Sequence, residues 1–183
     1  MSRDDIERVL AFWFAEGRQA QWFERDEAFD RDVGTALSPL HAQAAAGALD
    51  DWAQDPRGAL ALIILLDQVP RNLYRGTARA FATDAKALAV CRAALADGHD
   101  AALASEDEKA FLYLPLEHSE NLADQERSVA CFGRLSNETY RRYAELHRDV
   151  VARFGRFPHR NPALGRETTE AEAAFLHEPD SSF

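Results

Sequence analysis

Side chains that bind anions gather in two segments with a shared pattern. Residues 67–76 read DQVPRNLYRG and residues 156–166 read RFPHRNPALGR, and each has a proline, then Arg-Asn, then an arginine beside a glycine. A guanidinium group binds carboxylates and phosphates through two hydrogen bonds, and an asparagine amide offers a donor and an acceptor. The pattern therefore predicts a site for a small anion. Its candidate ligand-binding residues are Asp67, Arg71, Asn72, Arg75, Arg156, His159, Arg160 and Asn161.

A third polar stretch, residues 115–120 (PLEHSE), interrupts an apolar segment that is expected to be helical. The unperturbed pKa of a histidine lies near neutrality, so His118 with Glu117 or Glu120 is suited to general acid–base catalysis. Pro115 is expected to break the helix here and to turn these side chains away from regular packing. His118, Glu117 and Glu120 are therefore the catalytic candidates, and we expect them to share one cleft with both basic segments.

The same residues also suit a purely structural role. In that interpretation Asp67, Glu117 and Glu120 pair with the arginines and pin the loops onto the core, because structural ion-pair networks resemble functional sites. The sequence leaves both interpretations open, and with them the question of whether the protein is an enzyme.

Motifs for metals and common cofactors are missing. The chain has no HExxH motif and no paired ExxH spacing, and it lacks the GxGxxG, GxxxxGK[ST] and GxSxG signatures. We therefore expect neither a metal nor a cofactor, and His147, on an apolar helical face, is expected to be a core residue.

Composition indicates a single globular domain over residues 1–183, with a frayed tail from about 178 to 183. The chain of 183 residues is 46% hydrophobic and carries a net charge of −10, which disfavours nucleic acid and anionic membranes as partners. The longest apolar run, residues 59–66, is too short to span a bilayer, and the polar N-terminus does not resemble a signal peptide. Cys91 and Cys131 lie outside CxxC patterns and are expected to be buried free thiols, so we expect a cytoplasmic protein.

Helical signals run along the whole chain, without the alternating pattern of a strand. Asp55-Pro56 is an N-cap followed by a proline, and it opens a helix that is apolar all round and is expected to end at Pro70. Ser105-x-x-Glu108 and Thr169-x-x-Glu172 are capping boxes. The sequence predicts an all-α fold, a compact bundle of about eight helices stacked as hairpins around the helix over residues 56–68.

Several strings resemble one known family along nearly the whole chain. They are WF at 22–23, LLDQVPRNLYRG at 65–76, FATD at 81–84, YLPLEHSE at 113–120 and RFGRFPHRNPALGR at 153–166. The chain is similar here to the bacterial domain-of-unknown-function family 924 (DUF924). The resemblance implies an all-α fold related to tetratricopeptide-repeat hairpins, and it implies no reaction.

Two functions therefore remain open from the sequence. The first is a polar cleft that binds a small anionic ligand, with or without catalysis. The second is a tetratricopeptide-like helical scaffold that binds a peptide or a partner protein in a groove. The direction of the arginines separates them, because convergence on one pocket favours a ligand and a broad exposed stripe favours a partner. We also predict that the two Arg-Asn segments lie close together in the fold.

Overall fold

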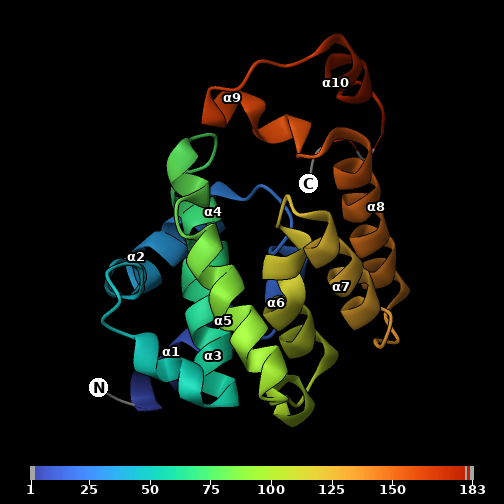
Figure 1. The fold of residues 1–183 in the computed structure, drawn as a ribbon. Coiled ribbons are helices and arrows are strands. Elements are labelled where there is room, and N and C mark those ends of the chain that lie inside the picture. Colours follow the sequence, from blue (N-terminus) through green and yellow to red (C-terminus); the bar gives the residue numbers. More distant parts are fainter. Residues whose placement is uncertain (1–2, 180, 182–183) are drawn as a thin grey trace.

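The computed structural model describes residues 3–179 and 181, and this part of the chain is helical with no strand (Figure 1). The predicted all-α class is confirmed. In chain order the helices are α1 (Arg3–Trp13), α2 (Glu27–Ala45), α3 (Pro56–Ile63), α4 (Val69–Leu73), α5 (Asp84–Ala96), α6 (Glu106–Glu117), α7 (Leu122–Phe132), α8 (Glu138–Phe154), α9 (Asn161–Leu164) and α10 (Glu170–Phe175).

The helices pack around α3, which contacts α1, α5 and α6 (Figure 1). Consecutive helices α6 and α7, and then α7 and α8, pack against each other. After α8 the chain passes over one end of the molecule (Figure 1), where Arg160, directly before α9, lies 3.7 Å from Asp84 at the start of α5. This crossing brings residues 156–166 back to the helices that carry residues 67–84.

Side-chain caps fix where many of these helices begin. A cap satisfies backbone N–H groups that have no partner in the first helical turn. The two predicted capping boxes are confirmed. The side-chain oxygen of Ser105 or Thr169 accepts the backbone N–H of the third helical residue, and the carboxylate of that residue accepts the backbone N–H of Ser105 or Thr169. Further N-caps that accept backbone N–H bonds are Asp26, Asp55, Asn121 and Asn137.

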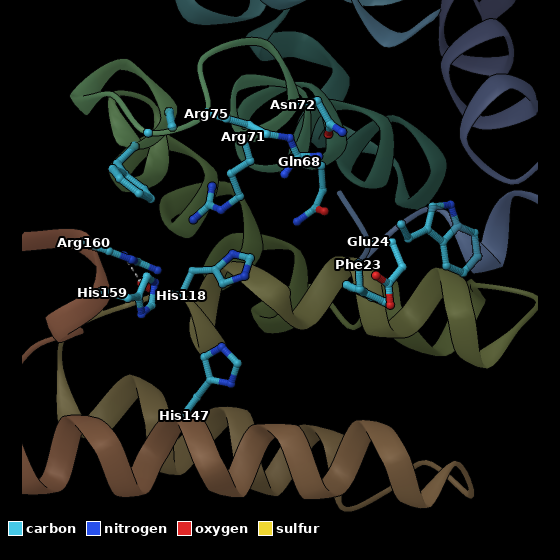
Figure 2. Close-up of a pocket in the computed structure, with 14 residues that line it drawn as sticks. Phe23, Glu24, Gln68, Arg71, Asn72, Arg75, His118, His147, His159 and Arg160 are labelled. Atoms are coloured by element: carbon cyan, nitrogen blue, oxygen red, sulfur yellow. Dashed lines mark hydrogen bonds between the residues drawn. The ribbon is translucent and has the colours of Figure 1, made fainter. Parts of the chain in front are cut away.

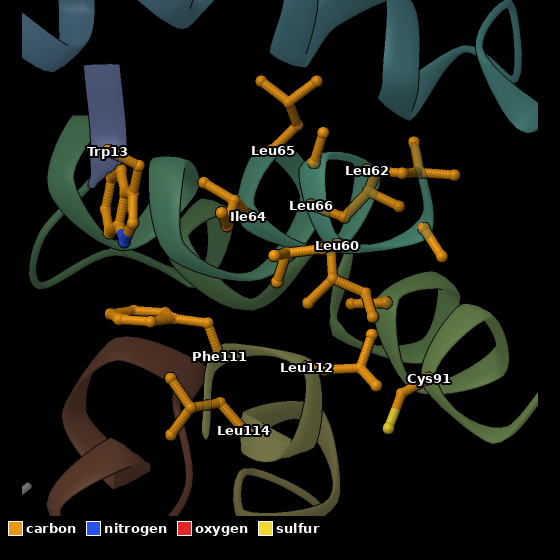
Figure 3. Packing of buried hydrophobic residues seen from close by; sticks show 14 of the residues in the cluster. Trp13, Leu60, Leu62, Ile64, Leu65, Leu66, Cys91, Phe111, Leu112 and Leu114 are labelled. Carbon is orange, nitrogen blue, oxygen red and sulfur yellow. The ribbon is translucent and has the colours of Figure 1, made fainter. Parts of the chain in front are cut away.

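The predicted central helix is buried on every side. Residues 58–69 are fully or almost fully excluded from solvent, and Leu65 has an exposed fraction of 0%. Figure 3 shows Leu65 and Leu66 on this helix, with Phe111 and Leu112 of α6 and Cys91 of α5 packed nearby. The two cysteines, Cys91 and Cys131, are buried free thiols as expected.

Replacing Leu65 with alanine is expected to lower the free energy of unfolding by about 2–5 kcal/mol, because the methyl groups removed leave a cavity in a close-packed core. Chemical denaturation of both proteins measures the difference. Leu164→Ala is the matched control, since Leu164 is 37% exposed. Equal losses for both variants would contradict the central position of this helix.

The expected end of the central helix at Pro70 is wrong. The chain continues from α3 through a π-helical turn, Ile64–Gln68, directly into α4, with Pro70 in its first turn. The wide turn pairs Val69 N–H with the carbonyl of Ile64, which leaves the carbonyl of Leu65 without its usual backbone donor.

Side chains replace the backbone donors that are lost there. The carbonyl of Leu65 lies 2.8 Å from His41 Nδ1, which must donate because a carbonyl only accepts. Proline has no N–H, so the carbonyl of Leu66 also lacks its normal partner, and it accepts from the hydroxyl of Thr83. These two contacts explain why the proline is tolerated without a helix break.

The expected break at Pro115 is also wrong. Helix α6 continues through Pro115 to Glu117, and His118 is its C-cap residue, with its N–H on the carbonyl of Leu114. Proline removes one hydrogen bond near the last turn, and the free carbonyls at the helix end find another donor. Gln125 Nε2 lies 2.6 Å from the carbonyl oxygen of Glu117 and 2.6 Å from that of Ser119. The polar stretch is therefore the joint between α6 and α7.

The tail that we expected to fray is described only in part. Residues 180, 182 and 183 lie outside the described residues. Ser181 is buried, and its hydroxyl donates to the carbonyl of Leu176. In the described part of the chain, no helix has the length and apolar character needed to cross a membrane.

Candidate functional site

Asp67 is a fully buried carboxylate in the π-helical turn. Its Oδ2 accepts from Gln68 Nε2 at 2.6 Å, and its Oδ1 lies 3.3 Å from Arg71 Nη1. Burial raises the pKa of Asp67, but the positive charge of Arg71 and the contact with His118 outweigh it and hold this pKa below the usual range. Asp67 is therefore ionised at neutral pH, inside the protein.

His118 is oriented by Asp67. Its Nδ1 lies 2.9 Å from Asp67 Oδ1 and 3.0 Å from Oδ2. Because an ionised carboxylate only accepts hydrogen bonds, Nδ1 carries the proton. Burial and the charge of Arg71 lower the pKa of His118, so the neutral ring has its lone pair on Nε2, which makes no hydrogen bond to the described residues. This is the arrangement of a general base held by a carboxylate.

Arg160 approaches His118 from the other basic segment. Its Nη1 donates to the carbonyl of His118 at 3.0 Å, and the guanidinium carbon lies 4.9 Å and 4.4 Å from the ring centroids of Phe81 and Phe157. Arg160 is only 7% exposed, and among the described residues its Nε finds no hydrogen-bond partner. Burial, then repulsion from Arg71, lowers the pKa of Arg160 to about 10.

The two Arg-Asn segments meet at Asp84, the first residue of α5. Arg71 binds Asp84 with two hydrogen bonds, of 2.9 Å and 3.0 Å, while Arg160 Nη1 lies 3.7 Å from Asp84 Oδ2. The prediction that these segments lie close together is confirmed. Since Arg71 takes both oxygens of Asp84 at close range, Arg160 is the less completely neutralised cation of the pair.

A second buried acid–histidine pair lies behind His118. Glu117 Oε1 is 3.5 Å from Nδ1 of His147, which donates at 2.8 Å to the carbonyl of Tyr143. Burial, with the negative charge of Asp67, raises the pKa of Glu117 to about 8. Burial and the nearby His118 lower the pKa of His147 well below its usual value. At neutral pH the carboxyl of Glu117 is therefore mostly protonated, whereas Asp67 is ionised.

These elements enclose a pocket of about 280 Å³. Figure 2 shows Arg71, His118, His159 and Arg160 gathered on one side of it, and Phe23 on the other. Burial and the charge of Arg160 lower the pKa of His159 to about 4, so this ring is neutral too. The residues that line the pocket are Trp22, Phe23, Glu24, Gln68, Arg71, Asn72, Arg75, Gly76, Ala80, Phe81, His118, His147, His159 and Arg160.

Other candidate ligand-binding residues are held by acids. Arg75 binds both oxygens of Asp30 at 2.7 Å and 2.8 Å, and Asn72 Nδ2 donates to the same carboxylate at 2.7 Å. Both residues line the pocket, but the amide nitrogen of Asn72 and the charge of Arg75 are already bound to Asp30. They shape the pocket wall rather than supply a free charge.

Five candidates do not line this pocket: the buried carboxyl groups of Asp67 and Glu117, and the side chains of Glu120, Arg156 and Asn161. Glu120 binds Arg166 with two hydrogen bonds and accepts from the backbone N–H of Phe157. Arg156 pairs with Glu172 at 2.6 Å, and Asn161 Nδ2 lies 3.3 Å from the same carboxylate. These contacts fasten the segment after α8 to α10 and to the joint between α6 and α7.

Sequence reasoning missed several residues of the pocket and the carboxylate that joins its arginines. That carboxylate, Asp84, binds Arg71 without lining the pocket itself, and it appeared only as the last residue of the FATD string. Phe81 lies in the same string, and His147 was expected to be a core residue but also lines the pocket. Trp22 and Phe23 appeared only in the resemblance. In the part of the chain that is described, no three His, Cys, Asp or Glu side chains are grouped to hold a metal ion.

Comparison with known proteins places the chain among proteins without an assigned activity. Residues 9–180 match the family described as "Bacterial protein of unknown function (DUF924)". A solved structure of a protein of unknown function from Agrobacterium tumefaciens is 43% identical, with a TM-score of 0.89, over 94% of this chain and 96% of that chain. No protein of curated function matches the chain.

Proposed function

We propose that this chain, which belongs to the bacterial family of unknown function DUF924, binds a small organic anion in the pocket and acts on it by general-base catalysis in the cytoplasm. The anionic group binds at Arg160. His118 Nε2 takes a proton from the ligand or from a water molecule, and Asp67 stabilises the imidazolium that forms.

The observation that carries the proposal is the position of His118. A buried carboxylate fixes its Nδ1 at 2.9 Å, and the carbonyl of the same residue holds Arg160 at 3.0 Å. A base with a defined tautomer and an incompletely neutralised cation therefore lie at the same pocket. Buried polar groups of this kind need partners, and an anion from solution would supply one for Arg160.

Two further features support a small ligand over a peptide-binding scaffold. Arg71 and Arg160 converge on one pocket rather than forming an exposed stripe (Figure 2). The two carboxyl groups that lie beside histidines also have opposite pKa shifts. The pKa of Asp67 is lowered, and the pKa of Glu117 is raised to about 8. Environments that separate two such pKa values are typical of acid–base sites.

The binding step is tested by thermal unfolding with propanoate or inorganic phosphate, against chloride at equal ionic strength. A ligand that binds only the folded state raises the melting temperature as its concentration rises. We expect such a rise in the wild type and its loss in Arg160→Gln.

Arg92→Gln is the matched control, because Arg92 is already bound by both oxygens of Asp124 away from the pocket. It is expected to keep the anion-dependent rise whatever its own melting temperature. An equal rise in Arg160→Gln and the wild type would show that the anions act elsewhere, and the structural interpretation of the cluster would then hold.

A further inference from the structure

The pocket has two ends of different chemistry. Figure 2 places Arg160 and His118 at one end, Phe23 and Glu24 at the other, and Gln68 between them. The proposed function uses only the first end. The second end bears on which anion the pocket accepts.

Phe23 presents an uncovered aromatic ring at its end of the pocket. It is 61% exposed, which is unusual for so large an apolar side chain. The rings of Phe23 and Phe111 are parallel within 6°, with centroids 5.9 Å apart, and the ring of Trp22 stands at 79° to Phe23. Two aromatic neighbours thus fix the orientation of Phe23 while much of its surface remains open to a ligand.

Glu24, beside Phe23, is the one acidic residue that lines the pocket within the described chain. It makes no hydrogen bond or ion pair with the described residues. A carboxylate at this end repels a second negative charge on a ligand whose first charge is at Arg160. The arrangement favours a single anionic group at one end and an uncharged body at the other.

We infer that the pocket selects monoanions with an aromatic body, which packs on Phe23 and Trp22 while the anionic group binds Arg160. This inference rests on the proposed function and adds the class of ligand to it. Aromatic packing adds to the burial of apolar area, so the ring raises affinity beyond that of the anionic group alone.

The test is calorimetric titration of the wild type with propanoate, hydrocinnamate and glutarate. Hydrocinnamate is propanoate with a terminal phenyl ring, and glutarate has no ring but carries a second carboxylate at the far end of a three-methylene chain. We expect hydrocinnamate to bind at least about 10-fold more tightly than propanoate, and glutarate to bind no better than propanoate.

Two variants locate the effect. Phe23→Ala is expected to weaken hydrocinnamate binding by about 3–10-fold and to leave propanoate unchanged. Glu24→Gln is expected to improve glutarate binding alone. Phe23→Leu provides an apolar side chain without a ring, and unchanged melting temperatures show that the variants fold.

The outcomes separate this inference from the proposed function. Absence of binding for all the anions would overturn both. Equal affinities for propanoate and hydrocinnamate, or a hydrocinnamate affinity that Phe23→Ala leaves unchanged, would overturn the ligand class and leave the anion site in place.

Discussion

Replacing Glu117 with glutamine is expected to stabilise the protein at alkaline pH. The pKa of Glu117 is raised to about 8 by burial, whereas an unfolded glutamate titrates near 4.3. The folded protein therefore holds a proton that the unfolded chain releases, and the stability of the wild type falls as pH rises between these two values. Glutamine has a similar shape and no proton to lose.

The free energies of unfolding of the wild type and Glu117→Gln are expected to be nearly equal at about pH 4. At about pH 9 that of Glu117→Gln is expected to be about 3–5 kcal/mol higher. Chemical denaturation across this pH range measures the difference. Glu126→Gln, an exposed glutamate on α7, is the control and is expected to follow the wild type. Parallel curves for the wild type and Glu117→Gln would show that Glu117 is ionised in the folded protein at neutral pH.

Replacing Asp67 with asparagine is expected to lower the free energy of unfolding by about 3–5 kcal/mol at neutral pH, because the change breaks a buried ion pair with Arg71. The pKa of Asp67 is lowered, so its contribution is present above the unfolded value of about 3.9 and is lost as pH falls below it.

The difference in the free energy of unfolding between the wild type and Asp67→Asn is therefore expected to become smaller in acid. Denaturation curves at neutral and acidic pH measure it, with the exposed Asp51→Asn as control. A difference that persists unchanged in acid would mean that lost packing, rather than lost charge, causes the effect.

Local signals in the sequence predicted much of the fold. The capping boxes at Ser105 and Thr169 and the all-apolar helix over residues 56–66 depend on neighbours within a turn or two, so the sequence contains them directly. The prolines were harder to interpret. Pro70 is tolerated because His41 and Thr83, far along the chain, supply the missing donors.

The site was also predictable only in part, because its contacts join residues that are distant in the sequence. The shared Arg-Asn pattern indicated two segments that meet, and they do. The partner of each charge depends on how helices pack, so the sequence suggested Glu117 or Glu120 beside His118, whereas the structure places Asp67 there. Asp84, which joins the two segments, appeared only as the last residue of the FATD string, and no signal in the sequence paired it with Arg71 or Arg160.

In the proposed function, one pocket holds both an anion site at Arg160 and a base at His118. A crystal structure of the protein grown with hydrocinnamate tests this arrangement. We expect the carboxylate within hydrogen-bond distance of Arg160 Nη2, the phenyl ring against Phe23, and His118 Nε2 facing the ligand or a water molecule beside it. Hydrocinnamate bound elsewhere, or a pocket that holds only water at saturating hydrocinnamate, would contradict this arrangement.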